Sequence, residues 1–238
     1  ATFGAADFRW TADALWSRTA SDAAPGLPAA SGTAGRLRFG LEGRWTRTLA
    51  SGTLLAPRLG IGLRHDWGDA GSGLGLEVRG GADWSDPARG LSLGLEGRTL
   101  ALHDDGDFED WGLALAVSWD PRTETRRGLS ATVNGALGGA GSGGLAALPG
   151  PAAFPDATDG DGGAWSAEVA HGNGLGKGMV GSAYGRASGS LGTKGEVRFG
   201  WRVEPDASHA ANAGLDLWAE PGADGDGSAV GAGIDWRW

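Results

Sequence analysis

The sequence predicts an all-β protein, a transmembrane antiparallel up-and-down β-barrel of about twelve strands with long loops on one rim and short turns on the other. Three observations predict this fold. Apolar and polar residues alternate with a period of two in one segment after another. The connections between these segments alternate in character, and tryptophans stand near the segment ends. The 238 residues are enough for one sizeable domain, so we expect residues 1–238 to form a single outer-membrane barrel domain.

Composition limits the possible functions. The chain has no cysteine, 47 glycines, 12 tryptophans and a net charge of -9. An acidic chain argues against nucleic-acid binding, which requires a basic surface. Lys177 and Lys194 are the two lysines among 20 basic residues, and arginine is favoured where charges are paired and poorly hydrated. No apolar run in the sequence approaches the roughly 20 residues of a membrane-spanning helix.

Twelve alternating segments follow one another along the chain, each of about the 9–11 residues that a tilted strand needs to cross a bilayer. We expect them over residues 6–20, 35–48, 54–66, 74–85, 91–103, 111–120, 129–137, 164–172, 179–187, 195–204, 211–218 and 228–238.

The connections predict the two rims of the barrel. Long acidic or glycine-rich stretches follow the odd-numbered segments, for example "SDAAPGLPAASGTA", "DWGDAGSG" and "DDGDFED", with a short exception at 188–194. Tighter links such as "ASGT", "SDPARG" and "NGLGKG" follow the even-numbered ones. Outer-membrane barrels sort their connections in this way, and an even strand number puts both ends of the barrel on the short-turn rim.

The stretch "RLRFGLEGRW" (36–45) shows the two faces of one predicted strand. Leu37, Phe39 and Leu41 alternate with charged residues. In a membrane barrel the apolar face meets lipid and the charges face the lumen. The predicted lumen-facing residues are nearly balanced in sign, and interleaved glycines leave room for their side chains. They are Arg38, Glu42, Arg44, Arg64, Glu77, Arg79, Glu96, Arg98, Glu196, Arg198, Arg202 and Asp235.

Tryptophans at the segment ends predict two aromatic girdles at the membrane surfaces. Trp45, Trp84 and Trp119 fall near the short-turn rim, and Trp111 and Trp165 near the other rim. The last stretch, "VGAGIDWRW", alternates to its end and places Ile234, Trp236 and Trp238 on one face. Outer-membrane barrels typically end on such a strand, and the barrel-assembly machinery reads its terminal aromatic residue.

Residues that could carry chemistry form no convincing constellation, so we predict no catalytic residue, no metal site, no cofactor and no enzyme activity. The four histidines, His65, His103, His171 and His209, lack metal-ligand spacing. His103 beside Asp104 and Asp105 is the best candidate for a hydrolase pair. Because the predicted loops are rich in acidic residues, a histidine can stand next to an aspartate by chance. The acidic stretch 156–163 has no glycine at the position that a calcium loop requires and no closing glutamate, and 174–178 is expected to be a hairpin turn.

Several of these stretches together resemble a known family. "RLRFGLEGRW", "GLRHDWGDA", "DWSDPARGLS" and "EVRFGWRV" resemble the C-terminal translocator barrels of bacterial autotransporters, closely over residues 8–137 and more loosely over 164–238. The resemblance implies a 12-stranded barrel in the bacterial outer membrane that anchors or exports a passenger, which this chain does not contain. It also implies the lipid bilayer, lipopolysaccharide, the barrel-assembly machinery and an N-terminal passenger as partners.

Two other functions are compatible with the same pattern. The first is a passive pore or a purely structural transmembrane barrel, which would conduct small solutes if its lumen is open. The second is a soluble all-β binding module such as a lectin-like sandwich, in which the apolar face would form the core. Lumen width separates the first from a translocator, and solubility without detergent would favour the second.

The face assignment predicts how two neighbouring positions respond to arginine. Leu41→Arg would place a charge in lipid and should lower the free energy of unfolding by about 2–4 kcal/mol near the bilayer midplane. Gly40→Arg, on the other face, should act through crowding of the lumen. Denaturant titrations of both variants in detergent would measure this, and equal tolerance at the two positions would contradict the assignment.

Overall fold

The computed structural model describes residues 6–23, 25–26, 28–69, 71–104, 110–122, 124–138, 163–190, 195–205, 212–221 and 228–237. These residues form one antiparallel sheet in which each strand of the main path pairs with the next one along the chain. The strands are β1 (Ala6–Ser21), β2 (Ala30–Trp45), β3 (Arg47–Thr48), β4 (Leu54–Gly68), β5 (Gly73–Asp86), β6 (Leu91–His103), β7 (Trp111–Trp119), β8 (Gly128–Gly138), β9 (Ala164–Gly176), β10 (Met179–Ser190), β11 (Glu196–Pro205), β12 (Asn212–Pro221) and β13 (Ser228–Arg237).

The prediction of an up-and-down all-β fold is confirmed. Each of the twelve predicted segments overlaps a strand of the main path, and β6 has the predicted bounds. The thirteenth strand, β3, has two residues and pairs only with β4, beside the main path. None of the described residues forms a helix that is long and apolar enough to cross a membrane.

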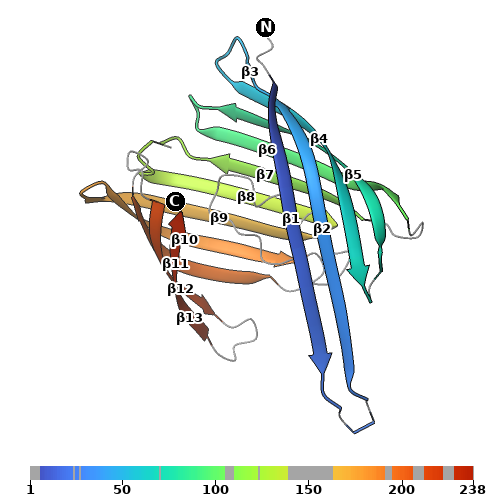
Figure 1. Ribbon diagram of the computed structural model, residues 1–238. Coiled ribbons are helices and arrows are strands. Elements are labelled where there is room, and N and C mark those ends of the chain that lie inside the picture. The colour runs from blue at the N-terminus through green and yellow to red at the C-terminus, as the bar shows by residue number, and fades with distance from the viewer. Residues whose placement is uncertain are drawn as a thin grey trace.

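The sheet is strongly curved but open. β1 and β2 cross in front of β6 to β9, and β13 lies at the other edge of the sheet (Figure 1). Among the described strands, β1 pairs with β2 and β13 pairs with β12, and these two edge strands do not pair with each other. The structure therefore has the predicted sheet and strand order, but the sheet is not closed into the predicted barrel.

The expected sorting of connections holds only in part. Half of the predicted long loop "DWGDAGSG" belongs to strands, because β4 ends at Gly68 and β5 begins at Gly73. The predicted loop over 21–34 is shortened because β1 and β2 pair out to Ser21 and Ala30, and their tips extend beyond the other strands (Figure 1). On the other rim, the connection between Trp119 and Gly128 is longer than a tight turn.

The strand registers keep the two faces separate across the whole sheet. Phe39 is paired with Leu63 and Ala12, and Leu63 with Leu76. On the opposite face Arg38 is paired with Arg64, and farther along the sheet Arg202 is paired with Asp216. Irregularities between Leu76 and Glu77 and between Met179 and Val180 shift the register locally. The large apolar residues of these strands thus share one face, and the arginines and carboxylates gather on the other.

Burial on these two faces is the reverse of that in a water-soluble sheet. Arg64 is 1% exposed, whereas its neighbour Leu63 is 63% exposed. The same contrast holds for Arg38, at 5%, and Phe39, at 55%. The charged face lies on the inside of the curve, where its side chains cover one another, and the apolar face lies on the outside.

Candidate functional site: a buried charge network on the inner face

The inner face of β2 to β7 carries a network of arginines and carboxylates, which we call the inner charge network: Arg36, Arg38, Arg44, Arg58, Arg64, Asp66, Glu77, Arg79, Asp83, Glu96, Arg98 and Asp110. Period-two alternation explains the placement, since every second residue of each strand reaches this face. The prediction that Arg38, Arg64, Glu77, Arg79, Glu96 and Arg98 share one face is consistent with this arrangement.

Glu77 is the centre of one part of the network and is 2% exposed. Its Oε1 accepts a hydrogen bond of 3.0 Å from Arg79, and its Oε2 accepts one of 3.3 Å from Arg98. The Arg38 Nε lies 3.6 Å from the same Oε2. One buried carboxylate therefore joins arginines from β2, β5 and β6, and it compensates charges that would be costly to bury alone.

Asp66 and Asp110 connect the network at the long-loop rim. Asp66 accepts hydrogen bonds from Arg36, at 3.0 Å, and from Arg64. Arg64 also donates to Asp110, which accepts a further bond of 2.9 Å from Arg98. Asp110 immediately precedes β7, so these contacts tie a residue outside the strands to arginines of β4 and β6.

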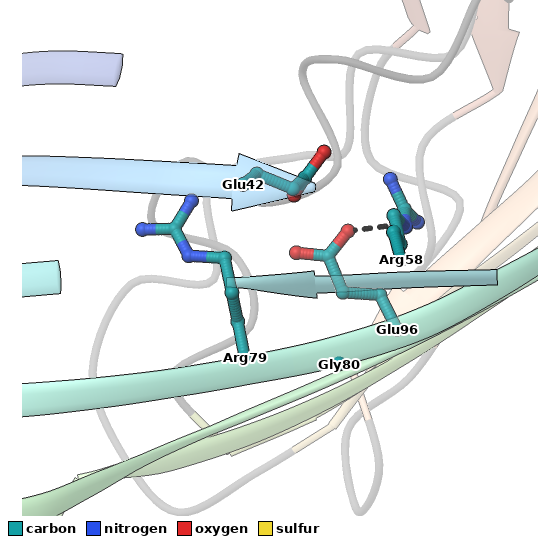
Figure 2. Close-up of a pocket in the computed structure, with 5 residues that line it drawn as sticks. All are labelled: Glu42, Arg58, Arg79, Gly80 and Glu96. Carbon is teal, nitrogen blue, oxygen red and sulfur yellow. Dashed lines mark ion pairs between the residues drawn. The ribbon is translucent and has the colours of Figure 1, made fainter. Parts of the chain in front are cut away.

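A third part of the network surrounds a small recess near the short-turn side of the inner face. Arg58 forms ion pairs with Glu96, at 3.0 Å, and with Asp83, at 3.8 Å. Figure 2 shows the Glu96 carboxylate between Arg58 and Arg79, with Glu42 on β2, the strand beside that of Arg58. Gly80 completes the lining of this recess. Arg44 pairs with Asp83 at 3.0 Å and is half-exposed.

Glycines on the inner face make space for the long arginine side chains. A Cβ atom at Gly60 would lie 2.7 Å from the Arg79 side chain, and one at Gly81 would lie 2.9 Å from Arg58 Nε. The interleaved glycines predicted to leave room for arginine do so at Gly60, where the charged side chain of the next strand lies against the backbone.

A second group of charges lies on β9 to β12. Arg202 pairs with Glu168 at 3.3 Å and with Glu204 at 3.4 Å, and its guanidinium lies 4.8 Å from the Tyr184 ring centroid. Tyr184 donates a hydrogen bond of 3.1 Å to Asp216.

The neighbouring Arg198 pairs with Glu220 at 3.1 Å and lies 4.1 Å from the Trp218 ring centroid. Of the other predicted residues, Glu196 is exposed at the start of β11. Asp235 is placed in β13 by its backbone position.

The structure also places the predicted girdle residues. Trp45, Trp84 and Trp119 lie at or near the ends of β2, β5 and β7, and Trp111 and Trp165 at the starts of β7 and β9. By register all five share the outer apolar face: Trp84 is paired with Leu93, and Trp119 with Leu91. Ile234 is on this face and is 81% exposed. Trp236 lies in β13, and Trp238 lies outside the described residues.

His103 lies beside the inner charge network and is not exposed in an open cleft. Its side chain is 2% exposed, and its Nε2 lies 3.7 Å from Asp66 Oδ2. The neighbouring Asp104 accepts a hydrogen bond of 2.9 Å from the backbone N–H of Leu74. The third member of the suggested hydrolase group, Asp105, lies outside the described residues, as do His209 and most of the stretch 156–163. Within the described part of the chain, no three His, Asp or Glu side chains gather as a metal site would require.

Five members of the network were not among the predicted lumen residues. Four of them lie on charged positions of the same alternating segments, so the pattern itself could have identified them: Arg36, Arg58, Asp66 and Asp83. Asp110 ends the acidic stretch "DDGDFED", and a single acidic residue of a loop gives no signal of burial. Its position directly before Trp111 is the one available clue.

Comparison with known proteins adds no relative: no protein-family model matches the chain, and no curated protein matches it.

Glu77→Gln should destabilise the folded protein strongly, because it leaves the guanidinium groups of Arg38, Arg79 and Arg98 without their shared carboxylate. Breaking a buried ion pair typically costs about 3–5 kcal/mol. The control is Arg126→Gln, which removes an ion pair with Glu204 whose two side chains are 41% and 25% exposed. That change should cost no more than about 1 kcal/mol. Unfolding free energies in detergent measure both, and equal losses would contradict the central role of Glu77.

The lowered pKa of Asp110 predicts that the folded protein loses stability in acid. Burial acts to raise its pKa, but the hydrogen bond from Arg64 and the charges of Arg98 and Arg64 outweigh burial and hold the pKa below its ordinary value. The folded state therefore favours the ionised carboxylate. Its contribution is complete above the ordinary pKa of about 3.9 and is lost as the pH falls through the lower folded pKa.

Denaturant midpoints recorded between about pH 6 and pH 2 should show this acid step in the parent chain. The step should shrink in Asp110→Asn and persist in Asp120→Asn, a matched change in a short-turn connection. An undiminished step in Asp110→Asn would show that the Asp110 contacts do not favour its ionised form.

Proposed function

We propose that this chain is a transmembrane β-barrel of the bacterial outer membrane that serves as an autotransporter-type translocator, anchoring or exporting an N-terminal passenger. The reversed burial of its two faces is the observation that carries the membrane part of this proposal. The contrast between Leu63 and Arg64 recurs along the sheet, as in Phe199 at 59% and the half-buried Arg198 beside it.

The choice between water and lipid follows from the size of these effects. Leaving a large apolar side chain in water forfeits about 1.5–3 kcal/mol relative to burying it. Leu59, Ile61 and Leu63 of one strand are all more than half exposed. In lipid the same side chains are in a favourable environment, and the inner charges remain in contact with one another. Lipid also disfavours open sheet edges, so the proposal includes closure of the sheet.

The outer face supports the same proposal at its borders. The five girdle tryptophans share the apolar face and stand near the strand ends, where amphipathic rings favour the membrane–water interface. These tryptophans lie between the exposed aliphatic residues of the strands, such as Leu95 and Leu115, and the connections between strands. This is the arrangement of outer-membrane barrels.

The translocator role is supported by the motif resemblance over residues 8–137 and 164–238 and by the charged inner face. The proposed mechanism is passive: the wall excludes lipid, and the ion-paired arginines and carboxylates give a polar, rigid surface along which a passenger segment passes or rests. No residue needs to change protonation state or form a bond in this mechanism.

A passive pore is the second candidate, favoured by one observation. The inner face of β7 to β9 carries small side chains, Ala114, Ala136 and Ala164, in the row where Arg58 and Glu96 stand on β4 and β6. A closed barrel with one small-residue wall would have space beside the charge network for water and small solutes.

Refolding from denaturant into detergent micelles tests the membrane proposal. We expect a gel band whose mobility changes on boiling, together with insertion into lipid vesicles. A chain that folds as a monomer in buffer without detergent would contradict it and would place Leu63 and Phe39 in a soluble core.

A reporter domain fused before Ala1 tests the translocator role in a Gram-negative cell. Protease accessibility at the cell surface is the expected result. A reporter that stays in the periplasm while the barrel is heat-modifiable would contradict translocation. Steady conductance of the refolded chain in a planar bilayer would then favour the pore.

A further inference from the structure

Two turns at the short-turn rim repeat one local arrangement. The stretches "WSDPARGLS" and "WDPRTETRRGLS" both lead from a girdle tryptophan through Asp-Pro to an arginine. The Arg89 backbone N–H donates a hydrogen bond of 3.3 Å to Asp86 Oδ1, and the Arg122 backbone N–H donates one of 3.0 Å to Asp120 Oδ1. In both turns an aspartate therefore holds the backbone of an arginine just beyond the end of a strand.

The first of these arginines lies on the side of the rim that carries the tryptophan girdle. Asp86 is paired with Leu91, and Leu91 is paired with Trp119, so the three residues form one row of the outer face. Arg89 Nη1 donates a hydrogen bond of 2.7 Å to Asp86 Oδ2. This ion pair keeps the Arg89 guanidinium close to the outer face.

The two turns are joined into one surface. The Asp120 backbone N–H donates a hydrogen bond of 2.7 Å to the carbonyl of Gly90, which directly follows Arg89. Within the second turn, the Arg126 backbone N–H donates one of 2.8 Å to the Arg122 carbonyl. These bonds fix Arg89 and Arg122 in adjacent turns, and we call the two residues the rim arginine pair.

The guanidinium groups of the rim arginine pair are more accessible than the carboxylates that hold them. The Arg89 side chain is 76% exposed, whereas that of Asp86 is 6% exposed. Arg122 is exposed, whereas Asp120 is half-buried. A ligand that reaches this rim therefore meets two guanidinium groups before it meets either carboxylate.

Charge distinguishes the two rims of the sheet. In the described connections of the short-turn rim, Arg127 and Lys177 are also exposed, and Glu124 is the exposed acidic residue. The exposed charged residues of the described long connections are all acidic: Asp22, Asp69 and Asp104. An anionic partner is therefore attracted to the short-turn rim and repelled from the opposite one.

Backbone conformation also indicates that basic charge is favoured at this rim. Among the described residues, the non-glycine residues with positive φ are Arg126, at 52°, and Lys177, at 51°. Lys177 and Gly178 form the two-residue loop between β9 and β10, where asparagine, aspartate or glycine is the usual first residue. Basic side chains thus stand at positions where the backbone alone favours other residues.

The chemistry of this surface fits a phosphate group. Guanidinium groups bind phosphate oxygens in a bidentate manner. Tryptophan rings favour the level of the lipid headgroups, so arginines directly beyond Trp84 and Trp119 lie where the phosphates of a bilayer lie. The short connections of outer-membrane barrels face the periplasm, where the adjoining leaflet consists of phospholipid.

We propose that the rim arginine pair binds the phosphate group of anionic phospholipids in the leaflet at the short-turn rim. This inference rests on the proposed membrane barrel, to which it adds a headgroup class and a binding position. Zwitterionic phospholipids also carry a phosphate, but their ammonium group cancels the charge that basic residues attract. Selectivity for the anionic headgroup is therefore the property that this site should show.

Native mass spectrometry of the refolded chain in micelles tests the proposal by counting bound lipids. The probes are phosphatidylglycerol and phosphatidylcholine with identical acyl chains, titrated into separate samples. We expect phosphatidylglycerol to half-saturate the parent chain at a concentration about 5- to 25-fold lower, since each basic residue near an anionic headgroup contributes about fivefold in affinity. High ionic strength should narrow this difference, because exposed charges are screened.

Arg122→Gln is compared with Arg18→Gln, a matched change of an exposed arginine near the long-loop rim. The first change should raise the half-saturating concentration of phosphatidylglycerol about fivefold, and the second should leave it unchanged. Arg89→Gln combined with Arg122→Gln should abolish the selectivity. The heat-modifiable gel band shows that each variant is folded, and Arg122→Gln alone carries the test if the double variant does not fold.

Equal binding of the two lipids by a heat-modifiable parent chain would overturn the lipid site while leaving the membrane proposal intact, and so would an equal loss in Arg18→Gln. Displacement of phosphatidylglycerol by equimolar inorganic phosphate would assign the surface to free anions, and displacement by a hexaglutamate peptide would assign it to an acidic polypeptide. Either result would overturn the proposal. A chain that folds as a monomer in buffer without detergent would instead refute the membrane barrel on which the site depends.

Discussion

The structure depends on one constraint: the guanidinium groups of the inner face must stay in contact with carboxylates while the opposite face stays apolar. Glu77 and Asp110 each accept from two arginines, so removing either would leave several buried charges without compensation. An ion pair in a low-dielectric environment is stable only when its geometry and hydrogen bonds are complete. The strand pairing and the glycines of the inner face keep these guanidinium and carboxylate groups within contact distance.

Register keeps the two faces apart because the side-chain period of a strand is two. A slip of one residue in any pair would move arginines to the outer face and leucines into the network. The contacts between Arg36 and Asp66 and between Arg58 and Glu96 link neighbouring and next-neighbouring strands, so they oppose such slips. Glycines such as Gly60 and Gly81 complete this arrangement, since a larger residue would displace the arginine lying on it.

Much of this fold follows from local pattern. Twelve strands, their order and the two faces could be predicted because alternation, turn residues and strand length are all encoded within a few residues of one another. The connections were harder to predict: the hairpin of β1 and β2 is longer than its glycine- and alanine-rich sequence suggests, because backbone pairing continues to Ser21 and Ala30. Asp110 could not be assigned to the network because its partners, Arg64 and Arg98, are distant in sequence. Closure of the sheet depends on the sum of all registers, which no single segment reveals.

Contact of the outer face with lipid distinguishes a membrane barrel from a soluble sheet. The decisive measurement is the accessibility of a nitroxide attached to a cysteine at position 63, in chain refolded into lipid bilayers, to oxygen dissolved in lipid and to a water-soluble nickel chelate. A membrane barrel predicts high collision with oxygen and little with the chelate at this position. High collision with the chelate, or shielding from both reagents, would contradict the membrane orientation of Leu63 and of the face to which it belongs.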